Sequence, residues 1–336
     1  MLQKCGGGGQ NRQEGKYIFH ILSDNITSKN QKRFQTLAKE LSKTYPCEIF
    51  TYLVSDKEFQ GYPKLHNSYT TYLRLKSASI LPSDITTCLY LDTDILVLCD
   101  LRELFKTDLK GNLLAAVGDF NTDKTLPSRT SLSPYAFDKN APYYNAGVML
   151  LNLRKWRDEN MESKALNFLK TYEVHYHDQD TINAIAKNQI LTLNPKWNLG
   201  AFYALALEKN LAINLNCGEY FLPYTQETFK EALKNPAILH YLGNITPKPW
   251  ESIYSKINPP LNSYTPFYHH SIQKWWEIAL NTPEFSKDLI ALKLQIERED
   301  LQQYSNTLSK ALQERDNFFL QKIQEIENVL YNHSHN

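Results

Sequence analysis

The sequence predicts an α/β fold with an open sheet, extended at its carboxyl end by one long helix. Apolar runs typical of buried strands alternate with helical periodicities along most of the chain, and this alternation favours a mainly parallel sheet. The length of 336 residues accommodates one large domain and an appendage, because single domains rarely exceed about 250 to 300 residues. Neither glycine nor proline occurs from residue 285 to the end, which favours an uninterrupted helix there.

Hydrophobic spacing predicts the elements of the main domain, residues 17–254. Apolar runs predict strands at 17–22, 48–54, 113–117, 147–151 and 190–193, and two more that flank an acidic tripeptide within 87–98. Apolar residues three and four apart predict helices at 28–41, 69–81, 161–171 and 179–188. Pro82 would end the second of these helices, since proline cannot continue the hydrogen-bonded ladder.

A change of composition near residue 255 marks the end of the main domain. Residues 255–284 form a connector rich in proline and aromatic residues, with an aromatic helix around Trp275 and Trp276. Residues 285–336 form an amphipathic helix, whose apolar positions are Leu301, Tyr304, Leu308, Leu312, Phe319, Ile323, Ile326 and Leu330. Arg315 interrupts this stripe and the other face mixes both charge signs. Self-association as a short coiled coil, or peripheral docking, is therefore favoured over a basic membrane-surface helix.

Charge and composition restrict the class of partner and the compartment. Lysine and arginine total 37 against 36 aspartate and glutamate, so no overall field attracts nucleic acid or anionic lipid. The five cysteines form no Cys-x-x-Cys pair, which favours reduced thiols in the cytoplasm. We find no apolar signal core and no uncharged apolar stretch of about 18 residues. We therefore expect neither secretion nor a membrane span.

The sharpest chemical signal is the acidic tripeptide Asp92-Thr93-Asp94. Side chains two residues apart in an extended segment lie on the same side, so Asp92 and Asp94 can present two carboxylates together. Carboxylate oxygens suit Mg²⁺ or Mn²⁺, and such a cation can bridge a diphosphate. Surface or turn aspartates are the ordinary explanation of a lone copy. The apolar runs on both sides, however, would make unpaired carboxylates costly here.

Three further segments have both a functional and a structural explanation. Asp178 and Gln179 stand at a predicted helix start, where they can bind a ligand or complete the helix terminus. The loop 240–250 combines histidine, glycine and lysine and can bind an anion, although a lone histidine is more often structural. Residues 145–147 precede a buried strand, where a simple turn is the alternative. The residues alone leave these alternatives open.

Taken in order, the motifs of the main domain match one known family. They are TTYLRL at 70–75, YLDTDILV at 90–97, DF at 119–120, YYNAGVMLLNLRKW at 143–156, DQDTIN at 178–183 and HYLG with KPW within 240–250. From about residue 17 to residue 250 the chain resembles glycosyltransferase family 8, in particular bacterial lipopolysaccharide galactosyl- and glucosyltransferases. The resemblance implies a GT-A nucleotide-diphospho-sugar transferase fold, in which a Rossmann-like mixed sheet merges with an acceptor-binding half.

The resemblance also implies a metal and a donor site. Asp92, Asp94 and His240 correspond to ligands of Mn²⁺, with Mg²⁺ as the alternative ion. The residues that resemble contacts to a UDP-hexose donor are Arg74, Asp92, Thr93, Asn145, Ala146, Gly243 and Lys248. Of these, Gly243 and Lys248 correspond to contacts with the diphosphate.

The activity implied is transfer of glucose or galactose from a UDP-sugar to a lipopolysaccharide or oligosaccharide acceptor, with retention of anomeric configuration. Gln179 corresponds to the residue nearest the anomeric carbon. Because an amide is a poor nucleophile, we expect a same-face displacement through a short-lived oxocarbenium-like state, with Asp178 as the reserve catalytic candidate. Asp119 and His66 resemble acceptor contacts. We expect the protein to act in the cytoplasm, attached peripherally to the inner face of the cytoplasmic membrane.

The amino-terminal segment, 1–16, departs from the family pattern. Family members open with a strand and a helix that hold uracil and ribose, and nothing similar precedes residue 17 here. We expect 1–16 to be an unstructured, aberrant leader, and its glycine run at 6–9 to be translated from a slippery homopolymeric G tract. On this hypothesis the chain is an inactive phase-off or truncated remnant, with only an assembly role for its C-terminal helix. Ile245 and Thr246 also lengthen the loop before Lys248 by two residues relative to the family.

A third alternative is a divalent-metal phosphohydrolase or nuclease built on the same acidic residues. The near-neutral net charge and the lack of a basic stripe in the sequence disfavour nucleic acid as its substrate.

Overall fold

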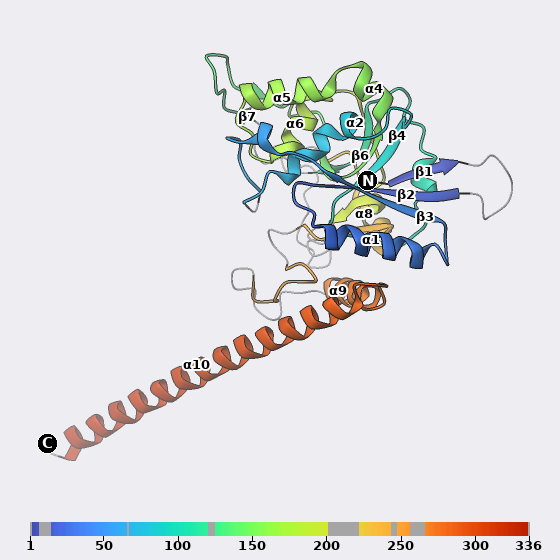
Figure 1. Cartoon of the computed structure of the whole chain (residues 1–336). Coiled ribbons are helices and arrows are strands. Elements are labelled where there is room, and N and C mark those ends of the chain that lie inside the picture. Colours follow the sequence, from blue (N-terminus) through green and yellow to red (C-terminus); the bar gives the residue numbers. More distant parts are fainter. Residues whose placement is uncertain are drawn as a thin grey trace.

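The chain folds as an α/β body from which one long helix projects (Figure 1). The computed structural model describes residues 2–6, 15–65, 67–119, 125–200, 222–242, 247–255 and 266–334. The projecting helix is α10 (Ser286–Ser334). The prediction of an α/β domain with a C-terminal helical extension is confirmed.

A seven-stranded sheet runs through the body in the order β10-β6-β9-β4-β1-β2-β3. Its strands are β10 (Ile190–Thr192), β6 (Leu114–Asp119), β9 (Tyr143–Asn152), β4 (Thr87–Leu91), β1 (Leu2–Gly6), β2 (Gly15–Ser23) and β3 (Cys47–Leu53). Two neighbouring pairs are parallel, β2 with β3 and β10 with β6, and the other four are antiparallel. The sheet is therefore mixed, as the family resemblance implies, and the mainly parallel arrangement expected from the alternation of strands and helices is wrong. Apolar runs report burial and not strand direction: nine of the ten residues of β9 are buried, although both its neighbours are antiparallel to it.

A smaller sheet, β11-β12-β5, lies beside the large one. Its strands are β11 (Leu199–Gly200), β12 (Ile238–His240) and β5 (Ile95–Val97). Because β4 and β5 belong to different sheets, the acidic tripeptide is the junction between them. Asp92 N–H donates to Gly147 O in β9 (2.8 Å), and Tyr241 N–H, just after β12, donates to Asp94 O (2.8 Å). The two aspartates are thus fixed where the two sheets meet.

Helices cover the sheet on both sides of this junction. The described helices and 3₁₀ turns of the body are α1 (Ser28–Leu41), η1 (Lys57–Phe59), η2 (Thr70–Lys76), α2 (Ser77–Ile80), α3 (Arg102–Phe105), α4 (Leu153–Asp158), α5 (Met161–Thr171), α6 (His177–Ile185), η3 (Pro195–Asn198) and α8 (Gln226–Lys234). Two short strands, β7 (Thr125–Leu126) and β8 (Tyr135–Ala136), pair with each other. The helix predicted at 69–81 is instead a 3₁₀ turn followed by one α-helical turn. In a 3₁₀ turn side chains three apart are aligned, which places Thr71 and Arg74 on one face.

Strand β1 corrects the expectation of an unstructured leader over residues 1–16. Leu2–Gly6 pair antiparallel with Phe19 to Gly15 of β2 along their whole length, and Leu2 also pairs with Leu89 of β4. Strand β2 likewise begins at Gly15, inside the expected leader. The physical reason is that β2 would otherwise present an unpaired row of backbone groups, which an extended peptide satisfies; toward β4 the peptide adds one pair. The remainder of the glycine run, 7–9, lies outside the described residues.

The connector 255–284 contains helix α9 (Pro266–Leu280), which packs against the start of α10. Trp276 and Ala279 of α9 bury Ile296 of α10. Asp300 of α10 accepts hydrogen bonds at Oδ1 from Ser252 Oγ (2.6 Å) and from Ile253 N–H (3.1 Å). The first turns of α10 are therefore attached to the body. Among the described residues, no helix has both the length and the apolar character that crossing a bilayer requires.

Candidate active site

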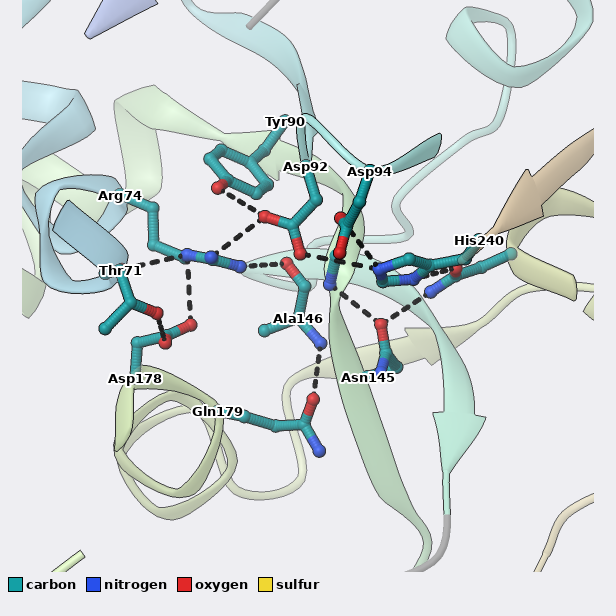
Figure 2. A network of polar contacts seen from close by, with 12 residues as sticks. Thr71, Arg74, Tyr90, Asp92, Asp94, Asn145, Ala146, Asp178, Gln179 and His240 are labelled. Atoms are coloured by element: carbon teal, nitrogen blue, oxygen red, sulfur yellow. Dashed lines mark hydrogen bonds and ion pairs between the residues drawn. The ribbon is translucent and has the colours of Figure 1, made fainter. Parts of the chain in front are cut away.

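The predicted site residues converge where β4, β5, β9 and β12 meet η2 and α6 (Figure 2). They line a cavity of about 200 Å³. The predicted residues on its wall are Arg74, Asp92, Asp94, Asn145, Ala146, Asp178, Gln179, His240 and Lys248. Strands that are far apart in the sequence thus supply one pocket.

Asp92, Asp94 and His240 form a cluster whose candidate ligand atoms all lie within 4.8 Å of one another. His240 Nε2 is 3.2 Å from Asp94 Oδ1 and 3.7 Å from Asp92 Oδ2. Two carboxylates and one imidazole fit a divalent cation such as Mn²⁺, which accepts both oxygen and nitrogen ligands. The three side chains predicted to hold a metal are therefore close enough to share one.

A chain of hydrogen bonds sets which nitrogen of His240 carries a proton. Gly147 N–H donates to Asn145 Oδ1 (2.9 Å), which identifies that atom as an acceptor. Asn198 Nδ2 donates to the same oxygen (2.8 Å), so Asn198 Oδ1 faces His240 Nδ1 (2.8 Å) and accepts its proton. Because Nδ1 carries a hydrogen, Nε2, which points at the two carboxylates, is the atom able to ligate a cation.

Arg74 is the centre of a second, buried network. Its Nη2 lies 2.9 Å from Asp92 Oδ1 and its Nε lies 3.0 Å from Asp178 Oδ2. It also donates to Ala146 O from Nη1 (2.7 Å) and to Thr71 O from Nε (3.0 Å). Burial opposes the charge of Arg74, but the attraction of Asp178 and Asp92 outweighs it and raises the pKa of the guanidinium. Arg74 thus holds two carboxylates in fixed positions.

The carboxylates of Asp178 and Asp94 have opposite pKa shifts. Burial raises the pKa of Asp178 above its ordinary value, and the opposing effects of Arg74 and the Thr71 hydroxyl do not fully compensate. Burial acts the same way on Asp94, yet hydrogen bonds and charge from His240 and Lys248 hold the pKa of Asp94 well below its ordinary value. The Lys248 Nζ to Asp94 Oδ2 distance is 2.8 Å. Asp94 is accordingly ionised at neutral pH and available to a cation.

Gln179 connects the cavity to Asp119. Its Oε1 accepts from Ala146 N–H (3.1 Å) and its Nε2 donates to Asp119 Oδ2 (3.2 Å). Asn145 Nδ2 donates to the same carboxylate oxygen (2.9 Å). The residue expected to contact the acceptor is therefore hydrogen-bonded to two residues expected to contact the donor.

Four predicted site residues do not line this cavity. Asp119 lines a separate cavity together with Tyr143 and Tyr144. Thr93 is exposed and does not line the site cavity. His66 and Gly243 lie outside the described residues, as do Ile245 and Thr246.

Sequence reasoning missed three residues that hold the site together. Thr71 donates from its hydroxyl to Asp178 Oδ1, and Tyr90 donates to Asp92 Oδ1 (2.7 Å) while its ring lies 4.4 Å from the Arg74 guanidinium carbon. Both lie inside sequence motifs, TTYLRL at 70–75 and YLDTDILV at 90–97, in which other residues were predicted to form the site. Asn198, in contrast, lies in η3 outside every motif, and no signal in the sequence pointed to it.

Comparison with known proteins agrees with this geometry. Residues 9–254 match the family model for Glycosyl transferase family 8. A putative glycosyltransferase of Haemophilus influenzae is 32% identical over 190 residues, which cover 54% of this chain and 54% of that protein. The lipopolysaccharide 1,3-galactosyltransferase of Salmonella typhimurium is 30% identical over 245 residues, which cover 71% of this chain and 65% of that enzyme. The matches therefore span between about half and two thirds of these relatives.

The structure of the galactosyltransferase LgtC in complex with donor and acceptor sugar analogs matches with a TM-score of 0.52 and 27% identity, over 69% of this chain and 78% of that one. The expected GT-A fold is thereby confirmed. Because the family model covers well over half of the sequence, the chain belongs to glycosyl transferase family 8.

Proposed function

We propose that this protein is a retaining hexosyltransferase that moves glucose or galactose from a UDP-sugar to a saccharide of lipopolysaccharide, with Mn²⁺ as its cofactor. One observation carries the proposal: three carboxylates, an imidazole, a lysine and an arginine surround a single cavity, and two of the carboxylates lie close to the imidazole. This combination suits a nucleotide diphosphate with its cation. The names of the similar enzymes, which act on lipopolysaccharide, support the acceptor class and the hexose.

Asp92, Asp94 and His240 are the residues that would hold the cation, which when bound neutralises charge on the departing diphosphate as a Lewis acid. Lys248, whose Nζ lies 2.8 Å from Asp94 Oδ2, adds a positive charge at the same end of the cavity. Arg74 keeps Asp92 and Asp178 oriented through its two ion pairs. The polar groups are therefore already ordered when donor binds, and little reorganisation opposes the reaction.

The hydrogen bonds of the two catalytic candidates favour a same-face displacement. Both carboxylate oxygens of Asp178 are engaged, Oδ1 by the Thr71 hydroxyl and Oδ2 by Arg74 Nε. Gln179 is held at both ends of its amide, and an amide is a poor nucleophile. A covalent glycosyl-enzyme would need one of these groups to leave its partners. We therefore assign Gln179 the role of contacting the sugar and Asp178 the role of orienting Arg74.

A transfer assay tests this function. The full chain is incubated with Mn²⁺, UDP-glucose or UDP-galactose, and lipopolysaccharide truncated in its core, and the anomeric configuration of the product is read by NMR. We expect UDP release that depends on acceptor with one of the two donors, and an α-linked product from the α-linked donor. Asp94→Asn should abolish transfer, whereas Asp100→Asn, which alters an exposed carboxylate paired with Arg102, should not.

Two outcomes would contradict the proposal. Release of UDP at the same rate without acceptor would indicate a hydrolase, and absence of transfer with every donor and acceptor would support the inactive remnant.

A further inference from the structure

Helix α10 exposes an apolar surface that nothing in the described chain covers. Its 49 residues extend over about 70 Å at 1.5 Å per residue, and Figure 1 shows them projecting from the body. Only the first turns are buried by α9, through Ile296 with support from Leu289 and Leu292. Every side chain described from Leu301 to Tyr331 is exposed.

Ten of the exposed apolar side chains of α10 form one straight stripe, which we call the α10 stripe, and Phe318, Leu320, Val329 and Tyr331 are exposed on either side of it. Its members are Ile290, Leu294, Leu301, Tyr304, Leu308, Leu312, Phe319, Ile323, Ile326 and Leu330, each more than 40% exposed. From Leu301 onward the spacing is three, four and four, repeated, which is a hendecad pattern. Such a repeat gives about 3.67 residues per turn, close to the natural period of the helix. A partner helix with the same repeat can therefore follow the stripe without strong supercoiling.

The stripe and the α9-facing residues occupy different sides of the helix. Leu289, Leu292 and Ile296 face α9, while Ile290 and Leu294 point elsewhere and remain 46% and 57% exposed. Attachment to the body thus leaves the stripe exposed, although Leu301 and Tyr304 line a hollow together with Ile253 and Tyr254 of the body. Removing large aliphatic and aromatic side chains from water is strongly favourable, so a continuous stripe of this kind is a strong candidate interface.

The charges beside the stripe disfavour an anionic membrane as the occupant. Residues 311–331, where the apolar side chains are densest, carry four acidic and two basic side chains. Helices that lie on anionic bilayers instead have basic polar faces.

The same charges favour a second copy of the chain in antiparallel orientation. With the two-fold axis between residues 315 and 316, Leu301 lies opposite Leu330, Leu308 opposite Ile323 and Leu312 opposite Phe319 of the second copy. Tyr304 then lies opposite Glu327 and Ile326 opposite Ser305. Arg315, which interrupts the α10 stripe, is level with Asp316 of the second copy, and the two Arg315 side chains are offset from each other by one residue, about 1.5 Å along the axis. A parallel pair in register would set Arg315 level with Arg315 and with no aspartate, so the antiparallel pair lessens the repulsion between these like charges without removing it.

We propose that α10 mediates dimerisation as an antiparallel two-helix coiled coil with a hendecad repeat, formed by the α10 stripes of two copies. The catalytic bodies lie at opposite ends of this coiled coil, so both cavities stay open. The proposal does not depend on the transferase activity.

The mass of the full chain in solution, measured by size-exclusion chromatography with light scattering, tests the interface. We expect twice the mass of one chain. Leu312→Glu together with Phe319→Glu should give the mass of one chain, because the antiparallel alignment sets these glutamates against each other. Gln313→Glu together with Asn317→Glu adds the same charge on the opposite side of the helix and should leave the dimer intact.

Cysteine cross-linking tests the orientation. Chains with Leu301→Cys mixed with chains carrying Leu330→Cys should form a disulfide-linked pair on oxidation, and neither variant should cross-link to itself beyond the level of the unmodified protein. Self-linking of Leu301→Cys would overturn the antiparallel arrangement. A monomer at all concentrations, or a wild-type monomer that sediments with vesicles of phosphatidylglycerol and phosphatidylcholine, would overturn the dimer.

Discussion

The candidate active site and the α10 stripe depart from the ordinary distribution of polar and apolar groups in opposite ways. The site buries charge: Arg74 and Asp178 are 8% and 6% exposed in their side chains. The stripe exposes apolar side chains along most of a helix. In the site nearly every charged group has a partner within the chain, whereas the stripe has none among the described residues. The first region is therefore organised before its ligands arrive, and the second is completed only from outside the chain.

Nearly every charged side chain in the site has a partner of opposite sign, but the net charge of the site is not zero. Three carboxylates, Asp92, Asp94 and Asp178, face two permanent cations, Arg74 and Lys248. One net negative charge remains when His240 is neutral. A divalent cation therefore finds both its ligands and an electrostatic attraction in the cavity.

The largest expected effect comes from removing the central cation of the site. Arg74→Ala leaves the buried Asp178 and the half-buried Asp92 without their partner, and breaking a buried pair in this way costs about 3–5 kcal/mol. We expect a loss of that size in urea unfolding and a fall in transfer rate of at least about 100-fold. Arg102→Ala is the matched control, since its pair with Asp100 is exposed and should contribute little to stability. Equal losses of unfolding free energy in Arg74→Ala and Arg102→Ala would contradict the distinction between the buried and the exposed ion pair.

The next effect comes from crowding the metal cluster. A Cβ added at Gly147 would lie 2.2 Å from His240 Cε1, so Gly147→Ala must displace the imidazole. We expect Mn²⁺ affinity, measured by calorimetry, to fall about 10- to 100-fold. Gly61→Ala is the control: its φ of +94° strains any side chain there, but no atom lies within 4 Å of a Cβ, so it should lower stability without lowering Mn²⁺ affinity. Unchanged affinity in Gly147→Ala would show that His240 is not a ligand.

A smaller effect is expected from Asn198, which positions His240 without lining the cavity. Asn198→Ala removes the acceptor of the Nδ1 proton, so both tautomers of the imidazole become accessible. We expect about a 10-fold loss of Mn²⁺ affinity with little change in the unfolding midpoint. Asn194→Ala, at the start of the same 3₁₀ turn, removes only a hydrogen bond to Lys196 N–H and should leave metal binding unchanged.

The smallest effect concerns a buried imidazole outside the site. His20 lies in β2 against Tyr52 and Phe50, and burial lowers its pKa from 6.5 to about 4. In the unfolded chain His20 takes up a proton near pH 6.5, whereas in the folded chain it stays neutral until about pH 4. The free energy of unfolding therefore decreases as the pH falls from 6.5 toward 4. Between pH 7 and 5.5 the loss attributable to His20 should be about 1 kcal/mol.

Unfolding measured at both pH values in His20→Leu should show that much less dependence on pH. His270→Gln, which alters an exposed histidine, should retain the dependence of the original chain. The same pH dependence in all three proteins would contradict the role of His20.

The sequence predicted those features that depend on local pattern. Helices α1 and α5 begin and end at the predicted residues, because apolar periodicity and breakers act over a few turns. The acidic tripeptide and the segments around Asn145, Asp178 and His240 could be found because their residue types are unusual beside apolar runs. Their convergence in one cavity needed the fold.

What could not be predicted depends on contacts distant in sequence. The direction of β9 is set by its neighbours β4 and β6, and β1 forms because β2 offers an open edge. Asn198 acts through His240, which is remote from it along the chain, and does so from a segment with no motif. Local propensity carries no information on any of these contacts.

Calorimetric titration of UDP into the full chain, with Mn²⁺ and then with EDTA, tests the central claim most directly: that the cavity around Asp92, Asp94 and His240 holds a nucleotide diphosphate through a divalent cation. We predict binding only with Mn²⁺, and its loss in Asp94→Asn but not in Asp100→Asn. Binding of equal strength in EDTA, or undiminished binding by Asp94→Asn, would contradict the account.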